Sequence, residues 1–268
     1  MPYMKKQFFI PVLLLTCLLA LLNSSFRTAE KKPAGEFYQL TIYHIKNADQ
    51  LSVTNAYLKN TYLPALHKSG LKNIGVFSSI DNDTAADKRI YVLIPFANLQ
   101  QYETLKNSLN AGTLLKNDNS AYANAAFNNA PFERVENVLL KAFRDMPILK
   151  TPTLTGPLAE RVYELRSYEA STEKLYLQKV NMFNEGGEVT LFNRLQFNAV
   201  FYAEVFSGSH MPNLMYMTTF DNKASRDEHW KNFGADSTWK RISALPQYQN
   251  TVSKADIYFL RPTDYSDY

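Results

Sequence analysis

Cysteine is almost absent from this sequence of 268 residues, and the only one, Cys17, lies within an apolar run near the N-terminus. If that run is removed from the mature protein, no thiol remains, which excludes disulfide bonds, thiolate metal sites and a cysteine nucleophile. The sequence has only four histidines, and no two of them have a metal-binding spacing such as His-x-x-x-His. It also lacks a nucleophile-elbow motif and a glycine-rich phosphate loop. We therefore predict no catalytic constellation, no metal site and no cofactor.

A cluster of charges of one sign is missing as well. The 29 lysines and arginines are scattered along the chain rather than gathered into a patch. Because clustered cations bind a phosphate backbone, this distribution gives nucleic-acid binding no electrostatic basis. The sequence does contain 46% hydrophobic and 13% aromatic residues, which indicates a folded chain with enough apolar material for two small cores.

The N-terminus has the pattern of a secretory signal. Lys5 and Lys6 precede an apolar run from Phe8 to Leu22, and small polar residues follow it. This pattern predicts a signal peptide over residues 1–29 and a periplasmic or secreted protein. The alternative is an uncleaved anchor, but the run contains Pro11 and is short for a bilayer span of about 20 residues. We expect no membrane span after cleavage.

Two stretches of the chain repeat one another. Phe37–Tyr43 and Val162–Tyr168 share the order tyrosine, polar residue, leucine, polar residue and a closing tyrosine, at an offset of 125 residues. Two further pairs of segments have an offset of 124 residues, namely Val76–Phe77 with Val200–Phe201 and Ile90–Phe96 with Leu214–Phe220. Three blocks in one order at nearly one offset indicate a tandem duplication.

Each copy has the same predicted order of elements, which is strand, helix, two strands, helix and strand. In the first copy we predict a helix from an N-cap at Asp49 to Gly70, with a local kink at Pro64 because proline removes a backbone donor. In the second copy the helix begins after Ser171 and ends at Gly186-Gly187. The other predicted strands are Ile74–Ile80, Arg89–Phe96, Val135–Phe143, Asn198–Phe206, Leu214–Phe220 and Ile257–Leu260.

A βαββαβ unit is ferredoxin-like, with one antiparallel sheet that carries both helices on one face. The other face needs cover, and a second such unit is the nearest one available. We therefore predict an α+β fold in which two tandem ferredoxin-like βαββαβ units form an intrachain dimeric α-β barrel. The predicted parts are a divergent first unit over residues 33–150, a linker over 151–159 and a second unit over 160–262.

Alternation along the strands divides the side chains between two faces. Tyr163, Leu165 and Ser167, like Tyr38, Leu40 and Ile42 in the first copy, form the more apolar set, which we expect under the helices. The more polar set is expected to face the opposite sheet. It provides the candidate ligand-binding residues Glu164, Arg166, Tyr168, Tyr202 and Glu204.

Arg166 has two interpretations. If it only pairs with the neighbouring carboxylates, Arg166→Met should destabilise the fold strongly. If it awaits an anionic ligand, the same change should cost little stability and abolish binding.

Three segments of the second copy form a recognisable set. Its opening strand contains Tyr163-Glu164-Leu165-Arg166-Ser167-Tyr168, its second helix carries Arg226 followed by Trp239, and its last strand is Ile257–Pro262. Together they resemble the NIPSNAP family, whose members open with Tyr-Glu-Leu-Arg-x-Tyr. The first copy departs from this pattern at Gln39 and Thr41, and the family's Pro-Gly turn is replaced by Ala170-Ser171-Thr172. The resemblance implies a dimeric α-β barrel of a bacterial, exported type.

The resemblance says little about chemistry, because the wider superfamily includes cofactor-independent monooxygenases, isomerases and haem proteins. We expect a protein of unassigned activity that binds a small molecule or a partner through its intersheet space. The alternative is a cofactor-independent enzyme of the monooxygenase or isomerase type that acts on a small hydrophobic or carbonyl substrate. An open cavity between the sheets would favour ligand binding or catalysis, and a filled interior would favour a partner-binding surface. The sequence leaves assembly into a homo-oligomer as an open alternative.

Overall fold

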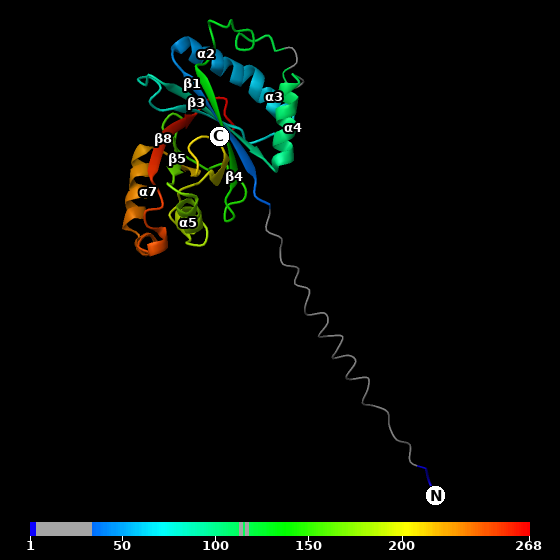
Figure 1. Ribbon diagram of the computed structural model, residues 1–268, viewed down its shortest axis with the longest axis vertical. Coiled ribbons are helices and arrows are strands. Elements are labelled where there is room, and N and C mark those ends of the chain that lie inside the picture. Colours follow the sequence, from blue (N-terminus) through cyan, green and yellow to red (C-terminus); the bar gives the residue numbers. More distant parts are fainter. Residues whose placement is uncertain (4–33, 113–114, 116–117) are drawn as a thin grey trace. The chain divides into compact units, whose positions relative to one another are not determined.

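Eight strands with alternating side chains close into a single antiparallel barrel (Figure 1). The computed structural model describes residues 1–3, 34–112, 115 and 118–268, and residues 34–268 form one compact unit. Residues 4–29 of the predicted signal peptide lie outside the described residues. The strands are β1 (Phe37–Ile45), β2 (Gly75–Ser79), β3 (Lys88–Phe96), β4 (Arg134–Ala142), β5 (Val162–Glu169), β6 (Phe201–Ser207), β7 (Asn213–Phe220) and β8 (Lys254–Pro262).

The order of the strands around the barrel is β1-β3-β2-β8-β5-β7-β6-β4, and β4 pairs with β1 to close it. Within the first half of the chain the neighbours run β4-β1-β3-β2, and within the second half they run β8-β5-β7-β6. The halves meet where β2 pairs with β8 and where β4 pairs with β6. The prediction of an α+β fold with a closed barrel is confirmed.

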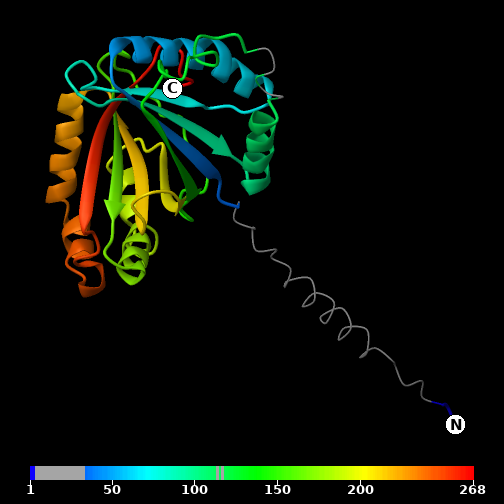
Figure 2. The same cartoon turned by 45° about the horizontal axis from the view of Figure 1, so that its top comes forward.

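Helices cover the outside of the barrel, and each half contributes its own group (Figure 2). They are α2 (Ala48–Tyr57), η1 (Leu58–Tyr62), α3 (Leu63–Lys68), α4 (Leu99–Asn110), α5 (Glu173–Phe183), α6 (Glu188–Arg194), α7 (Lys223–Ala235), α8 (Ser237–Ser243) and η2 (Pro246–Tyr248). None of the helices in the described ranges has the length and apolar character that crossing a membrane requires.

Asparagine begins the second helix of each half. The side chains of Asn98 and Asn222 accept hydrogen bonds from the backbone N–H groups of Gln101 and Ser225, which satisfies one free donor at the start of α4 and of α7. Because each asparagine follows its strand closely, the cap sets where the chain turns from sheet to helix. The two halves therefore share this capping device at equivalent positions.

The first helix of each half begins near its predicted cap, but not at it. Asn47 rather than Asp49 caps α2, and Thr172 rather than Ser171 caps α5; each side chain accepts from the backbone N–H three residues later. Gly187 has a positive φ of 85° and is the N-cap of α6, a short helix that the sequence does not predict.

Pro64 is accommodated by a change of helix type. The helical segment continues from Ala48 to Lys68, and the π-helical turn η1 lies directly before α3, in which Pro64 is near the start. Proline lacks an N–H donor and crowds the carbonyl four residues earlier, and the wider π turn relieves both problems. The irregularity predicted at this proline takes the form of a π turn.

The inside of the barrel is filled by side chains from both halves. Tyr38, Leu40 and Ile42 of β1 share one buried cluster with Tyr163 and Leu165 of β5. The prediction that this apolar set lies under the helices is therefore wrong. Both faces of the sheet are buried, one by the other half and one by helices, so apolarity alone does not tell them apart.

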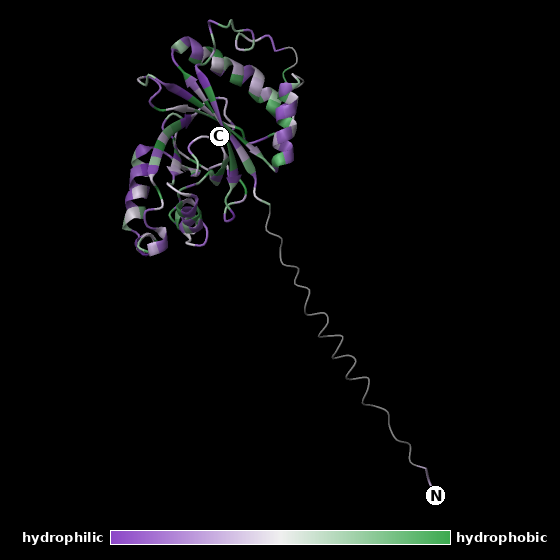
Figure 3. Cartoon of the chain, in the orientation of Figure 1, coloured by the Kyte–Doolittle hydropathy of each residue, from purple (hydrophilic) through white to green (hydrophobic). Residues whose placement is uncertain are grey.

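The outer face of the sheet carries the set that was expected inside. Tyr43 packs with Tyr57 of α2 in the outer core of the first half. Gln39 and Thr41 are buried beside it and both donate hydrogen bonds to the Asn137 side chain. Hydrophilic and hydrophobic residues are accordingly interleaved along strands and helices alike (Figure 3).

One end of the barrel interior is packed with aromatic rings. The ring of Tyr268 lies 5.4 Å from that of Phe77 and 6.2 Å from that of Tyr163, between centroids. Before it, the side chain of Asp267 accepts a hydrogen bond from the backbone N–H of Ile74 at 2.7 Å. The segment after β8 therefore runs along the start of β2 and fills this end of the barrel.

Candidate functional site

The five predicted site residues do lie on one face of the sheet, but it is the face under the helices. Glu164 contacts α7, Glu204 contacts α5, and Tyr202 belongs to the aromatic cluster beneath α5 and α6. Arg166 and Tyr168 lie on the same strand face as Glu164. The predicted placement in the intersheet space is wrong, because α7 supplies an arginine and an indole that make burial of the polar set tolerable.

Glu164 is the centre of this buried network. Its carboxylate is fully buried and accepts from Arg166 Nε at 2.6 Å and from Arg226 Nε at 2.6 Å. Arg226 Nη2 donates to Oε1 of Glu164 at 2.9 Å, and Trp230 Nε1 donates to Oε2 at 2.9 Å. Two arginines and an indole N–H thus saturate one carboxylate.

Arg166 is held on three sides. Besides Glu164, its guanidinium donates to the Tyr168 hydroxyl at 2.7 Å, and that hydroxyl lies 2.9 Å from the Tyr216 hydroxyl. The guanidinium also stacks on the Trp230 ring, 3.6 Å from its centroid. Of the two interpretations of Arg166, the structure supports the internal ion pair.

Tyr202 and Glu204 are not part of this network. The Tyr202 ring is fully buried and lies 5.7 Å from Phe183 and 5.8 Å from Phe192, between centroids. Glu204 accepts a hydrogen bond of 2.8 Å from the Tyr176 hydroxyl. The predicted site residues therefore divide into an ion network, an aromatic core residue and a partly buried hydrogen-bonded pair.

The charge on Glu164 makes the stability of the fold depend on pH. Burial alone would raise the pKa of Glu164, but the hydrogen bonds from Arg226 and the charges of Arg166 and Arg226 outweigh it and lower that pKa below its ordinary value of 4.5. A carboxyl whose pKa is lowered on folding stabilises the fold above its unfolded pKa, and this stabilisation is lost as pH falls through the folded pKa.

We therefore expect the difference in unfolding free energy between the parent and Glu164→Gln to be constant near neutral pH and to shrink below about pH 4.5. Urea unfolding of both proteins at several pH values measures it. A difference that stays the same down to the acid limit of the fold would contradict the ionised state of Glu164.

A cavity of about 420 Å³ opens at the end of the barrel away from Tyr268. Ile42, Val138 and Met215 form its apolar floor and belong to the interior cluster. Two residues further along the same strands come His44 of β1, Glu136 of β4 and Asn213 of β7. Because side chains two apart in a strand point to the same face, the cavity is the mouth of the barrel interior. We call it the barrel mouth.

Charged residues of the first half form one side of the barrel mouth. His44 lies between two carboxylates, with Nδ1 3.0 Å from Asp87 and Nε2 3.0 Å from Glu136. Arg89 Nε donates to Asp87 at 2.7 Å, and its guanidinium lies 5.6 Å from the centroid of the Tyr258 ring. On this side, Arg89, Asp87, His44 and Glu136 therefore form a continuous row of polar contacts.

The second half forms the other side in the same manner. Lys254 Nζ lies 2.7 Å from Asp256 and 3.3 Å from Glu169. His210, in the loop between β6 and β7, places Nδ1 3.3 Å from the same Glu169 carboxylate. Ser209 of that loop is exposed and also lines the barrel mouth.

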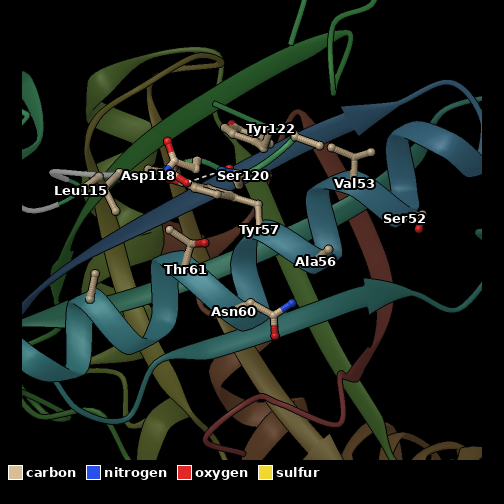
Figure 4. Close-up of a pocket in the computed structure, with 13 residues that line it drawn as sticks. Ser52, Val53, Ala56, Tyr57, Asn60, Thr61, Leu115, Asp118, Ser120 and Tyr122 are labelled. Atoms are coloured by element: carbon tan, nitrogen blue, oxygen red, sulfur yellow. Dashed lines mark hydrogen bonds between the residues drawn. The ribbon is translucent and has the colours of Figure 1, made fainter. Parts of the chain in front are cut away.

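A larger groove of about 680 Å³ lies on the outside of the first half, between α2 with η1 and the segment after α4 (Figure 4). Tyr57 and Tyr122 stack at its base with ring centroids 3.9 Å apart. Among the described residues that line it, no buried side-chain N or O atom lacks a hydrogen-bond partner. We prefer the barrel mouth, where such an atom is present on Asn213 and titratable groups converge.

The barrel mouth is the part of the site that the sequence did not reveal. The sequence nevertheless contains a signal for it. His44, Arg89 and Lys254 stand near strand ends, in alternation with the buried Ile42 and Tyr91 and the partly buried Tyr258. Within the described ranges, no group of three or more histidine, cysteine, aspartate or glutamate side chains could hold a metal ion.

Two solved structures are similar along most of the chain. A proposed monooxygenase from Lactobacillus acidophilus has a TM-score of 0.55 and 12% identity, and the alignment covers 85% of this chain and 94% of that one. A proposed monooxygenase from Fusobacterium nucleatum has a TM-score of 0.54 and 9% identity, covering 85% and 93%. At these identities the likeness shows the fold alone, and it defines the class as an α+β barrel protein. No curated protein matches the chain.

Residues 163–267 match the family model of NIPSNAP. This match lies in the second half of the chain and confirms the resemblance that the opening motif at Tyr163 to Tyr168 indicated. A NIPSNAP family protein from Agrobacterium tumefaciens is similar at 18% identity, over 44% of this chain and 97% of its own, with a TM-score of 0.36.

Proposed function

We propose that this protein binds a small molecule at the barrel mouth. The observation that carries the proposal is the buried Asn213 amide, one atom of which has no hydrogen-bond partner among the described residues, beside a cavity of about 420 Å³. Ligand cavities commonly measure about 300 to 1,000 Å³ and combine apolar walls with a few polar groups. The barrel mouth has this composition, with an apolar floor and a polar rim.

A bulky residue at the rim is expected to abolish binding. Ser209→Trp places a large ring at the barrel mouth without altering a core residue. The exposed Ser69→Trp adds the same ring at the other end of the barrel, where His67 contacts Asp267. We expect fragments detected by ligand-observed NMR to bind the parent and Ser69→Trp and to lose binding in Ser209→Trp. If every fragment that binds does so equally in all three proteins, the proposal is overturned.

The second candidate function is cofactor-independent catalysis on a small hydrophobic or carbonyl substrate. The observation in its favour is the contact between His44 and Glu136, which brings a titratable ring backed by a carboxylate to the cavity. A base there would remove a proton from the carbon next to a carbonyl and return it to a different atom of the resulting enolate, which is isomerisation. In D2O, catalysis predicts deuterium exchange into a bound ketone that is lost in His44→Gln, and binding alone predicts none.

We propose that the two halves are tandem ferredoxin-like units that arose by duplication, over residues 33–150 and 160–262 with a linker at 151–159. The repeated strand order β4-β1-β3-β2 and β8-β5-β7-β6 supports this, together with the matched caps Asn98 and Asn222. The second unit is the one that carries the NIPSNAP match, and the first unit is the divergent copy.

We also propose that the protein is exported to the periplasm or beyond, on the basis of Lys5, Lys6 and the apolar run that follows them. We expect N-terminal sequencing of the protein from its host to begin between Ser24 and Lys32. Recovery of an intact Met1 in the membrane fraction would indicate an uncleaved anchor instead.

A further inference from the structure

The cations that line the barrel mouth already have carboxylate partners within the chain, namely Arg89 with Asp87 and Lys254 with Asp256. The Glu136 carboxylate is in contact with the His44 ring, 3.0 Å away. A charged ligand would have to displace a partner that the chain itself holds at contact distance, and a tethered partner acts at high effective concentration. The rim therefore gives a free anion or cation little advantage.

The floor of the barrel mouth is uncharged. Ile42, Val138 and Met215 are buried apolar residues that face the cavity. Burial, and then the Asp256 carboxylate, raise the pKa of Tyr258, so its phenol stays neutral at physiological pH. A ligand that reaches the floor must have an apolar body, because burying a charge there would carry a large desolvation cost.

Asn213 stands between the rim and the floor with an unsatisfied amide. It is only 3% exposed, and its Nδ2 donates to the Ser167 hydroxyl at 2.8 Å, while Oδ1 has no partner in the described part of the chain. The serine hydroxyl can donate as well as accept, so exchanging the amide N and O still leaves one of them unpaired. The terminal torsion of asparagine is broad, which lets the amide turn its free atom toward an incoming ligand.

From these three observations we infer that the ligand of the barrel mouth is an uncharged molecule with an apolar body and one amide-like or hydroxyl group, which pairs with Asn213. The inference rests on the proposed binding function and specifies the ligand class of the same site. Leaving a buried amide atom unpaired is unfavourable, and a ligand that forms the missing hydrogen bond removes this penalty.

Three isosteric probes test the ligand class with the purified protein. Benzamide is neutral, benzoate is an anion and benzamidine is a cation, and all three have one ring and one planar three-atom group. We expect benzamide to bind at least about tenfold more tightly than the other two in an NMR titration, since about 1.4 kcal/mol corresponds to tenfold. Asn213→Leu should weaken benzamide by about tenfold, and Ser209→Trp should abolish its binding.

A second variant reverses the expected order. Asn213→Asp places a carboxylate at the same position, so benzamidine should then become the tightest of the three probes. This variant keeps the test decisive if Asn213→Leu does not fold. Benzamidine binding that is unchanged by Asn213→Asp overturns the assignment of Asn213.

The outcomes separate the ligand class from the proposed function. If benzoate or benzamidine binds the parent more tightly than benzamide and Ser209→Trp abolishes it, the class is wrong and the site stands. The class is also wrong, and the site stands, if none of the three probes binds the parent but other fragments bind it and fail to bind Ser209→Trp. If neither the probes nor any fragment responds to Ser209→Trp, both the class and the proposed function are overturned.

Discussion

Glu164→Leu is expected to lower the free energy of unfolding by about 3 to 5 kcal/mol, because it leaves two arginines without their shared carboxylate. Arg166 is only 9% exposed and stacked on Trp230, so it cannot turn out to water. Arg226 and the Trp230 indole N–H lose their acceptor as well. Urea unfolding followed by circular dichroism measures the difference.

An exposed ion pair provides the matched control. Lys59 and Asp264 lie 2.7 Å apart with both side chains largely in solvent, so Asp264→Asn should cost less than about 1 kcal/mol. Adding Arg166→Met and Arg226→Leu to Glu164→Leu should recover part of the loss, since no uncompensated charge then remains. A cost below about 1 kcal/mol for Glu164→Leu alone would show that the network is solvated and does not hold the helix to the sheet.

Residues 34–150 produced alone are expected to lose cooperative unfolding and to aggregate. In the whole protein β2 pairs with β8 and β4 pairs with β6, so the isolated half has two open strand edges. It also exposes the inner face that carries Tyr38, Leu40 and Phe77, which the second half covers. Size-exclusion chromatography and thermal melting, with residues 34–268 as the control, measure the effect.

One result would contradict this expectation directly. A half that stays monomeric and soluble and melts sharply would show that each unit has a sufficient core of its own under its helices. The barrel would then be a docking of two independent domains. Assembly of the half into a dimer would instead agree with the expectation, because a second copy would supply the missing sheet.

The barrel was predictable from the sequence because the recurring pattern of strand and helix segments indicates both the element order and an apolar sheet face that needs cover. Strand positions follow from alternation, and the predicted Arg89–Phe96 differs from β3 by one residue at its start. The helix starts were less certain, since several polar residues near Asn47 and Thr172 can act as caps. The hydrogen bond that makes one of these residues the cap forms only when the turn before the helix has folded.

The assignment of faces failed for a different physical reason. A polar residue usually marks solvent or a site, yet Glu164 is buried under α7 because Arg226 and Trp230, more than 60 residues away in sequence, neutralise it. Alternation groups side chains by face but does not say which face is which. The barrel mouth was missed with it, because Ser167 and Ile42 were assigned to the wrong layer.

The closure of the strands limits how this protein can meet another protein. Each strand of the barrel has a neighbour on both sides, but the two pairings between the halves are short. They join Phe77, Ser78 and Ser79 to β8, and Leu139 to Ala142 to β6. Recognition by adding a strand to a sheet edge requires an uncommitted edge. Where the strands are paired on both sides, a protein partner must therefore recognise side chains on the helices, the loops or the rim. Single surface substitutions there can tune its specificity without disturbing the sheet.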